Sequence, residues 1–349
     1  MIINPLKTGP WNLSDLKDVK PNGMKVFSCF HCGGGSTMGY KLAGFEVLGG
    51  VEIDPEMSKI YVKNHNPKYE YLMGVQEFKN IPNEELPPKL FELDILDGSP
   101  PCSSFSLAGS REKKWGKKKK FREGQAEQVL DDLFFDFIDV AEKLKPKVVV
   151  AENVKGLIQG NARGYVKQIF QRFRKAGYSC QLFLLNAAAM GVPQKRERTF
   201  FLANRIEAPK KITLDFEERP IPIEQAFIGL ECKKEKLTDQ QSFYWNKCKP
   251  GESFSKYHPK GSLFGQSKSN PKEPSRTLTT KMDMLFHWKW KRYLTVEEWI
   301  RIGSFPDDYK DISKYLIGMS VPPFMMQRVA DQIYRQWLWP YYNESSNKT

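Results

Sequence analysis

Two side chains that follow apolar runs could together activate a pyrimidine ring. Cys102 comes after the run Leu93–Leu96 and the turn Asp97–Pro101, whose two prolines stiffen the backbone. Glu152 lies near the end of a second apolar run, Val148–Val154. A thiolate can add to an electron-poor C=C–C=N ring while a protonated carboxyl group hydrogen-bonds the ring nitrogen, which makes the carbon between them nucleophilic. Cytosine is such a ring, so this pair indicates chemistry on cytosine.

These two side chains need a fold that brings them together. Gln125–Lys145 has apolar side chains at helical spacing and ends before Pro146, which predicts a helix between the two runs. Such a crossover places parallel strands with their carboxyl ends on one edge of a sheet. A single cysteine is more often a buried apolar side chain than a nucleophile. The prolines before Cys102 and the polar Ser103 and Ser104 after it favour an exposed loop instead.

The segment 26–54 has the pattern of a nucleotide-binding unit. Val26–Phe30 predicts a buried strand, and His31–Ser36 is a turn rich in glycine that leads into a helix. The next expected strand, Phe45–Ile53, has the acid Glu52 near its end. Glycines let a ligand approach the backbone, and an acid at this position binds ribose hydroxyls. A turn of this kind is also compatible with no ligand at all, or with a dinucleotide oxidoreductase.

The charge of the chain favours a polyanionic partner. Its 349 residues include 54 lysines and arginines against 41 aspartates and glutamates, a net charge of +13. Arg111–Arg122 (REKKWGKKKKFR) alone holds eight basic side chains and one acid, which makes it a candidate contact for nucleic acid. The ordinary alternative is a basic surface that only keeps the protein in solution.

The cysteines and the absence of targeting segments indicate a reducing, cytoplasmic setting. Met1–Pro5 does not begin a signal peptide, and no apolar run approaches the roughly 20 residues of a membrane span. Cys29 and Cys32 form a Cys-x-x-Cys pair around His31, a pattern also found in redox and zinc sites. One pair does not complete a tetrahedral zinc site, so we expect no metal.

A second polar motif follows the predicted catalytic strands. Gln194, Arg196 and Arg198 alternate along an extended segment, so their side chains are expected on one face. Guanidinium groups in such a row bind a phosphate or a base carbonyl. A solvated edge strand is the alternative interpretation.

The pattern predicts an α/β protein with a doubly wound, Rossmann-like sheet and a second, smaller domain. We expect an irregular leader at 1–23 and a catalytic and cofactor-binding domain at 24–204. After residue 204 the composition shifts toward proline, glycine and lysine, and no long helical periodicity is present. This change predicts a small domain at 205–290. Residues 291–349 are expected to return to the first domain with a C-terminal helix.

Taken together, these motifs resemble the C5-cytosine-specific DNA methyltransferase family, over roughly residues 24–340. The motifs occur in the family's usual order: Phe30–Ser36, Glu52, Ser99–Cys102, Glu152–Val154, Gln194–Arg198, Arg276–Thr279 and Gly318–Val321. The resemblance implies a methyltransferase that uses S-adenosylmethionine on a cytosine flipped out of double-stranded DNA, in a bacterial or phage setting. It also implies that residues 205–290 recognise the target sequence. A monomer is expected, because one cleft on one chain suffices.

The resemblance assigns roles residue by residue. Cys102 would attack C6, Glu152 would hold N3 and the amino group, and Arg196 and Arg198 would hold the base carbonyl or a flanking phosphate. The implied cofactor site comprises Phe30, Gly34, Gly35, Ser36, Glu52, Ile53, Pro100, Ser320 and Val321. The implied DNA contacts are Ser104, Lys117, Lys118, Lys119, Lys120 and Gln194.

Three positions depart from the family pattern, and other classes of protein stay open. Cys32 replaces the first glycine of the turn, Gly74–Gln76 lacks the usual acid after the third strand, and Met319 replaces an asparagine before Ser320. An RNA (tRNA) cytosine-C5 methyltransferase of the same fold is the main alternative. A DNA-binding protein without activity and a nicotinamide oxidoreductase leave the cysteine and glutamate motifs unexplained.

Overall fold

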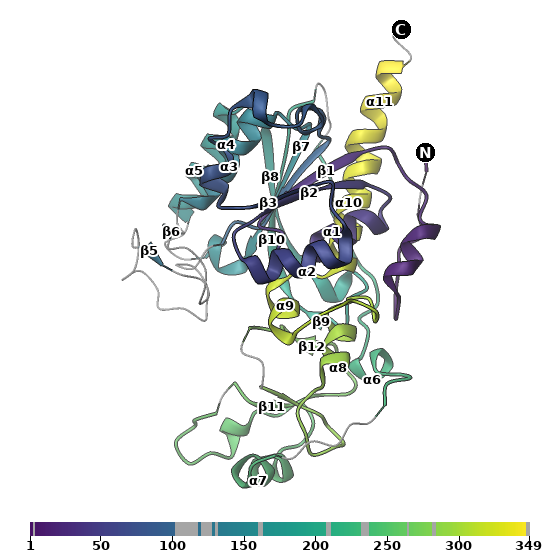
Figure 1. Ribbon diagram of the computed structural model, residues 1–349. Helices are drawn as coiled ribbons and strands as arrows, with labels where there is room; N and C mark the ends of the chain where they lie inside the picture. Colours follow the sequence, from purple (N-terminus) through teal and green to yellow (C-terminus); the bar gives the residue numbers. More distant parts are fainter. Residues whose placement is uncertain are drawn as a thin grey trace.

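The computed structural model describes most of the chain, and its centre is a seven-stranded sheet (Figure 1). The described residues are 1–2, 4–101, 118–119, 128–129, 132–159, 163–206, 211–231, 237–263, 265–280 and 284–346. The strand order is β3-β2-β1-β4-β7-β10-β8. The strands are β1 (Lys25–Cys29), β2 (Glu46–Glu52), β3 (Tyr69–Leu72), β4 (Ile95–Gly98), β7 (Val148–Val154), β8 (Ser179–Asn186) and β10 (Glu197–Asn204).

The sheet is parallel except for β10, which runs antiparallel between β7 and β8. The chain returns from β8 to β10 through a short connection without a crossover helix, and a short return produces antiparallel neighbours. The direction of winding reverses between β1 and β4. This confirms the predicted doubly wound α/β class, in which ligands bind at such a switch point.

Helices cover both faces of the sheet. One face carries α3 (Val75–Phe78), α4 (Leu133–Leu144) and α5 (Arg163–Lys175), and the other carries α1 (Gly35–Leu42), α2 (Pro55–His65) and α10 (Pro323–Ile333). A short π-helical segment, Tyr334–Leu338, continues α10 into α11 (Trp339–Ser346). None of the described helices is long and apolar enough to cross a membrane.

Each central strand is apolar on both sides because both faces are covered. Along β7, Val148 and Val150 belong to the core under α10, whereas Val149 and Ala151 belong to the core under α4 and α5. This alternation follows from the two-residue period of a strand. It explains why the sequence shows a continuous apolar run there.

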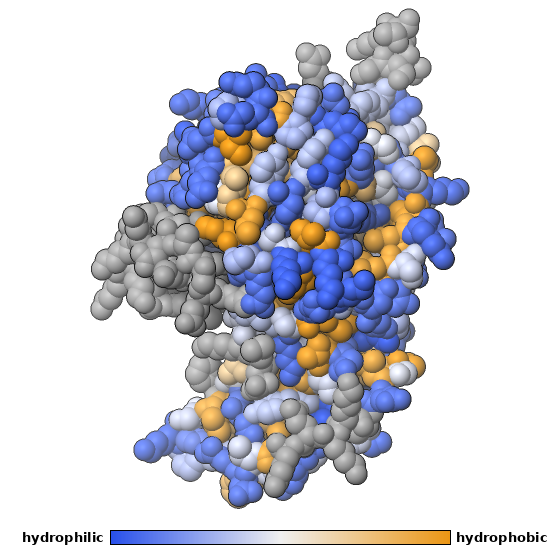
Figure 2. Space-filling view, in the orientation of Figure 1, coloured by the Kyte–Doolittle hydropathy of each residue, from blue (hydrophilic) through white to orange (hydrophobic). Residues whose placement is uncertain are grey.

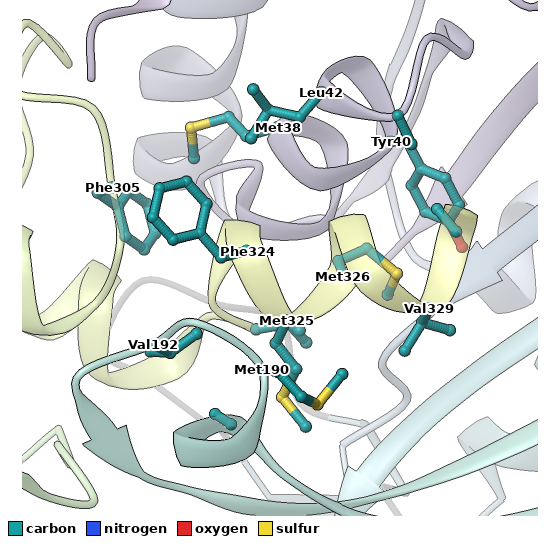
Figure 3. Packing of buried hydrophobic residues seen from close by; sticks show 14 of the residues in the cluster. Met38, Tyr40, Leu42, Met190, Val192, Phe305, Phe324, Met325, Met326 and Val329 are labelled. Atoms are coloured by element: carbon teal, nitrogen blue, oxygen red, sulfur yellow. The ribbon is translucent and has the colours of Figure 1, made fainter. Parts of the chain in front are cut away.

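Helices α1 and α10 pack unusually closely (Figure 3). A Cβ atom added at Gly39 would lie 2.5 Å from the Cβ of Met326 and 2.7 Å from the carbonyl oxygen of Pro323. Met38 and Leu42 of α1 and Phe324 of α10 extend the same cluster. The last long helix therefore fixes the helix that follows the glycine turn.

The N-terminal segment, expected to be an irregular leader, is part of the core. Trp11 is 2% exposed, and its indole Nε1 donates to the carbonyl of Ser304 at 3.0 Å. The backbone of Lys7 is hydrogen-bonded to Gln327 and Arg328 of α10. A short 3-10 helix, Leu13–Asp18, follows.

A smaller lobe lies below the sheet in Figure 1 and has its own apolar cluster. Its elements are α6 (Ile223–Ala226), α7 (Asp239–Lys247), β11 (Ser267–Lys268) and β13 (Leu285–Phe286). The cluster contains Leu237, Tyr244, Cys248, Phe254 and Phe286. Figure 2 shows that hydrophilic residues cover much of the visible face of both lobes, with hydrophobic patches between them. The domain at 205–290 stays a prediction: this cluster is separate, whereas Ile212, Leu214 and Ile223 belong to the core of the larger lobe.

The predicted helix Gln125–Lys145 is shorter than expected. Helix α4 begins only at Leu133, and Gln128–Val129 forms the short strand β6, which pairs with β5 (Lys118–Lys119). The helical spacing of Val129 was therefore misleading. Strand β7 matches the predicted run Val148–Val154.

Candidate active site

The ends of β4 and β7 lie side by side, as the sequence predicted. Asp97 pairs with Val150 and Gly98 with Ala151, so the loop after β4 and Glu152 share one edge of the sheet. Cys102 itself lies outside the described residues. The backbone leading to it is held in place, because the side-chain amide of Asn153 donates to the carbonyl of Pro100 at 3.0 Å.

Glu152 is a buried carboxyl group beside one arginine. Its Oε1 lies 2.8 Å from Nε of Arg198, and the hydroxyl of Ser99 donates to it. Burial raises the pKa of Glu152, although the positive charges of Arg198 and Arg196 oppose this shift. A carboxyl group with a raised pKa retains a proton more readily near neutral pH, as a donor to a ring nitrogen requires.

Arg198 is expected to stabilise the fold through this pair. In Arg198→Met, Glu152 is left buried without its partner, which costs about 3 kcal/mol of unfolding free energy. The penalty should be largest at pH 8 and smaller at pH 5, because the lone carboxyl group is protonated more easily in the folded state as pH falls. Urea unfolding at both pH values measures it. Arg172→Met, which breaks a partly exposed pair with Asp139, is the control and should cost below about 1 kcal/mol; equal losses would contradict the prediction.

Arg196 does not face the cleft as expected. It is 1% exposed, and its guanidinium donates from Nη1 to the carbonyl of Leu278 at 3.0 Å and from Nη2 to that of Gly318 at 3.1 Å. The expectation that it holds the base carbonyl or a phosphate is therefore replaced by an internal role. Arg196 joins its own motif to the motifs Arg276–Thr279 and Gly318–Val321.

Gln194, in the short strand β9 (Gln194–Lys195), is likewise buried rather than presented to DNA. Its Oε1 accepts from the backbone NH of Leu278 at 3.0 Å, and its Nε2 donates to the carbonyl of Ile302 at 3.4 Å. The segment beside it, β12 (Ser275–Arg276), pairs in parallel with β9. The other expected DNA contacts, Ser104, Lys117 and Lys120, lie outside the described residues, and only the backbone of Lys118 and Lys119 is described, as β5.

A cleft at the carboxyl ends of β1, β2 and β4 gathers several expected cofactor residues. It is lined by Phe30, Cys32, Glu52, Ile53, Asp54, Met57, Ser99, Pro101, Tyr315 and Met319. Glu52 accepts from the backbone NH of Cys32 at 2.8 Å and of Asp54 at 2.9 Å, so its carboxylate is fixed in position. Each carboxylate oxygen keeps a further lone pair for a ligand hydroxyl.

The glycine turn meets the last predicted motif directly. A Cβ atom at Gly35 would lie 2.3 Å from the carbonyl oxygen of Val321 and 2.8 Å from the Cβ of Ser320. Gly34 has a φ of 81°, in the left-handed region that favours glycine. The structure therefore brings the turn and Ser320–Val321 together at the start of α1. Ser36 is buried one residue further on.

Cys32 holds a backbone conformation that suits glycine, at the position where the family pattern has one. Its φ is 49°, and its side chain lines the cleft beside Glu52 and Met319. We expect Cys32→Val to lower the unfolding free energy by about 2 kcal/mol, because a β-branched side chain is strained there. Cys32→Gly should stay within about 1 kcal/mol of the wild type. Thermal unfolding of both variants checks this, and equal stabilities would argue against backbone strain.

Sequence reasoning missed several residues of this region. The sequence did not predict the hydrogen bond from Asn153 to the Pro100 carbonyl, or that Tyr315 and Met57 line the cleft. These contacts join distant parts of the chain. Asp97 was passed over as part of a turn, although a charged residue at the end of an apolar strand is a recognisable signal. Val75, at the position lacking the usual acid, is buried in α3.

Comparison with known protein families identifies the chain. The model of the family "C-5 cytosine-specific DNA methylase" matches residues 24–335. Type II methyltransferase M.FnuDI of Fusobacterium nucleatum is 34% identical over 202 residues, which are 58% of this chain and 52% of that protein. Type II methyltransferase M1.HphI of Haemophilus parahaemolyticus is 27% identical over 328 residues, 87% of this chain and 85% of that protein.

Solved structures show the same fold. DNMT2 of Spodoptera frugiperda, in a mutant form, superposes with a TM-score of 0.62 at 17% identity, covering 89% of this chain and all of that one. A prophage-encoded protein of E. coli gives a TM-score of 0.68 at 18% identity, covering 90% of this chain and 99% of its own. With the family model matching most of the sequence, the chain belongs to the C-5 cytosine-specific DNA methylase family.

Proposed function

We propose that this protein is a DNA (cytosine-5-)-methyltransferase that transfers the methyl group of S-adenosylmethionine to C5 of a flipped-out cytosine in double-stranded DNA. The observation that carries the proposal is the position of Glu152. Its carboxyl group is buried with a raised pKa, at the same sheet edge as the loop that leads to Cys102. The amide of Asn153 fixes that loop through Pro100.

The proposed reaction uses two side chains on the base. The Cys102 thiolate forms a bond to C6, and Glu152 hydrogen-bonds N3, which places the extra electron pair at C5. C5 then acquires the methyl group. Loss of the C5 proton to a base restores the double bond, and the C6–sulfur bond breaks to release Cys102. Arg198 holds the carboxyl group of Glu152 in place, through the contact from its Nε.

The cleft fits the methyl donor. Glu52, fixed by two backbone NH groups, is placed to take ribose hydroxyls, and Phe30 and Ile53 provide apolar contact beside it. The turn at Gly34–Gly35 packs against Ser320 and Val321, which brings these expected cofactor residues together at the start of α1. S-adenosylmethionine supplies an electrophilic methyl group; the residues of the cleft bind it and orient it toward the base.

The proposed partner is duplex DNA in the cytoplasm of a bacterium, or of a bacterium infected by a phage. The net charge of +13 and the basic stretch Arg111–Arg122 support a polyanionic substrate. The relatives from F. nucleatum and H. parahaemolyticus are named Type II methyltransferases. The lobe at 205–290 would read the target sequence.

The test is methyl transfer from tritium-labelled S-adenosylmethionine to mixed-sequence duplex DNA, with transfer RNA in parallel. We expect label in DNA, recovered as 5-methylcytosine at one recurring sequence. Label in RNA alone would replace the DNA proposal with the RNA methyltransferase of the same fold. Label in neither, with S-adenosylmethionine bound, would contradict the proposed function.

A further inference from the structure

A carboxyl group that the proposed reaction does not use is buried beneath the cleft. Asp97, at β4, is 1% exposed. Its Oδ2 accepts from the hydroxyl of Ser28 at 2.7 Å and its Oδ1 from the hydroxyl of Tyr40 at 3.2 Å, and Ser36 also donates to it. Three hydroxyl donors around one carboxyl group favour its ionised form.

Within the part of the chain that the structure describes, no cation balances this group. Among the described residues, no lysine, arginine or histidine nitrogen lies within the 4.0 Å of an ion pair with Asp97. The titratable groups that interact with it are Cys29 of β1, Tyr40 of α1, Tyr61 of α2 and Glu152 of β7, none of which is positively charged. A buried anion without a counter-ion is costly unless a ligand supplies one.

The proposed cofactor site would bring the sulfur of the methyl donor near this group. The ribose is expected at the end of β2, beside Glu52, and the cytosine at the ends of β4 and β7, beside Glu152. A sulfur between these two positions would lie near the ends of β1 and β4, where the sheet reverses its winding. Asp97 and Ser28 are the register pair of these two strands.

The charge can act without direct contact. Ser99, two residues after Asp97, lines the cleft, and at about 3.3 Å per residue the backbone of Asp97 lies roughly 7 Å from that of Ser99. Two unit charges at such a distance interact strongly when the medium between them is protein rather than water.

We propose that Asp97, ionised when the donor is bound, makes the cleft prefer S-adenosylmethionine, whose sulfur is cationic, over S-adenosylhomocysteine, whose sulfur is neutral. The proposal rests on the cofactor of the proposed function and adds a residue that sets its selectivity. Methyl transfer removes the positive charge, so the same residue favours exchange of product for fresh donor. Asp97 is a positioning residue and does not touch the reacting atoms.

The protonation of Asp97 provides a signature. Burial raises its pKa to about 7. A cation bound nearby lowers that pKa, so binding of S-adenosylmethionine should release protons near neutral pH, and its affinity should rise from pH 6 to pH 8. S-adenosylhomocysteine should release fewer protons and show a flatter affinity over this range.

Isothermal titration calorimetry of the full chain in buffers of different ionisation enthalpy measures the protons released. We expect Asp97→Asn to remove the difference in proton release between the two ligands and to reduce the preference for the cationic ligand by about tenfold. Asp94→Asn is the matched control: Asp94 is also buried on the approach to β4 but bonds Lys25 and Lys147 at the opposite end. Asp94→Asn should show the same difference in proton release between the two ligands as the wild type.

If Asp97→Asn does not fold, the proton release that the two ligands cause in the wild-type protein tests the proposal. Equal proton release by the two ligands, or an unchanged preference in a folded Asp97→Asn, would overturn the role of Asp97 while leaving the cofactor assignment intact. Failure of both ligands to bind would instead overturn the proposed function.

Discussion

Methyl transfer is expected to fall by at least about 10⁴-fold in Cys102→Ser, because a serine hydroxyl is not ionised near neutral pH and does not add to C6. Binding of S-adenosylmethionine should be unchanged, since Cys102 is assigned to the base and not to the cofactor. Transfer of tritium to duplex DNA measures the first effect, and calorimetry measures the second.

A trapped adduct separates loss of the nucleophile from misfolding. Duplex DNA with 5-fluorocytosine at the target has no C5 proton to lose, so the wild-type protein should remain covalently attached through Cys102 and migrate with the DNA under denaturing conditions. Cys102→Ser should form no such adduct. Cys180→Ser, a change on β8 at the far edge of the sheet, should trap DNA as the wild type does. An adduct in Cys102→Ser would show that another residue is the nucleophile.

Glu152→Gln is expected to lower kcat by about 10²–10⁴-fold, because an amide cannot supply a proton to N3 of the base. The pH profile gives a sharper test than the rate alone. Burial raises the pKa of Glu152, and the protonated form is the active one, so wild-type kcat should fall as pH rises through that pKa. The variant should lose this limb of the profile.

Glu197→Gln is the control for this substitution. Glu197 begins β10, next to Arg198, but its carboxylate is partly exposed and pairs with Lys155. Its removal should change kcat less than about twofold. If Glu152→Gln retained the wild-type pH profile, the acid would have to be another group.

The sequence predicted those parts of the fold in which local pattern and burial agree. The range of β7 matches because a strand covered on both faces is apolar throughout, and Glu152 is recognisable as the acid at its end. The glycine turn was located correctly because its left-handed backbone at Gly34 requires that residue type. In these cases a short stretch of sequence is enough to determine the local structure.

The parts that were missed depend on distant partners. Alternation put Gln194, Arg196 and Arg198 on one face, but it could not show that Arg196 is buried against Leu278 and Gly318 while Arg198 reaches Glu152. The leader looked irregular because nothing near Trp11 in the sequence shows that it packs beside Ser304.

The contact between the two ends of the chain has a consequence for synthesis on the ribosome. Gln327 donates to the carbonyls of Pro5 and Leu42, and Arg328 donates to that of Lys7, across more than 280 residues of sequence. Until α10 has left the exit tunnel, α1 lacks its neighbour and one side of the sheet is only partly covered. Contacts of such sequence separation form slowly, so the covering of this side of the sheet is a late step, before which apolar surface is exposed to chaperones and to aggregation.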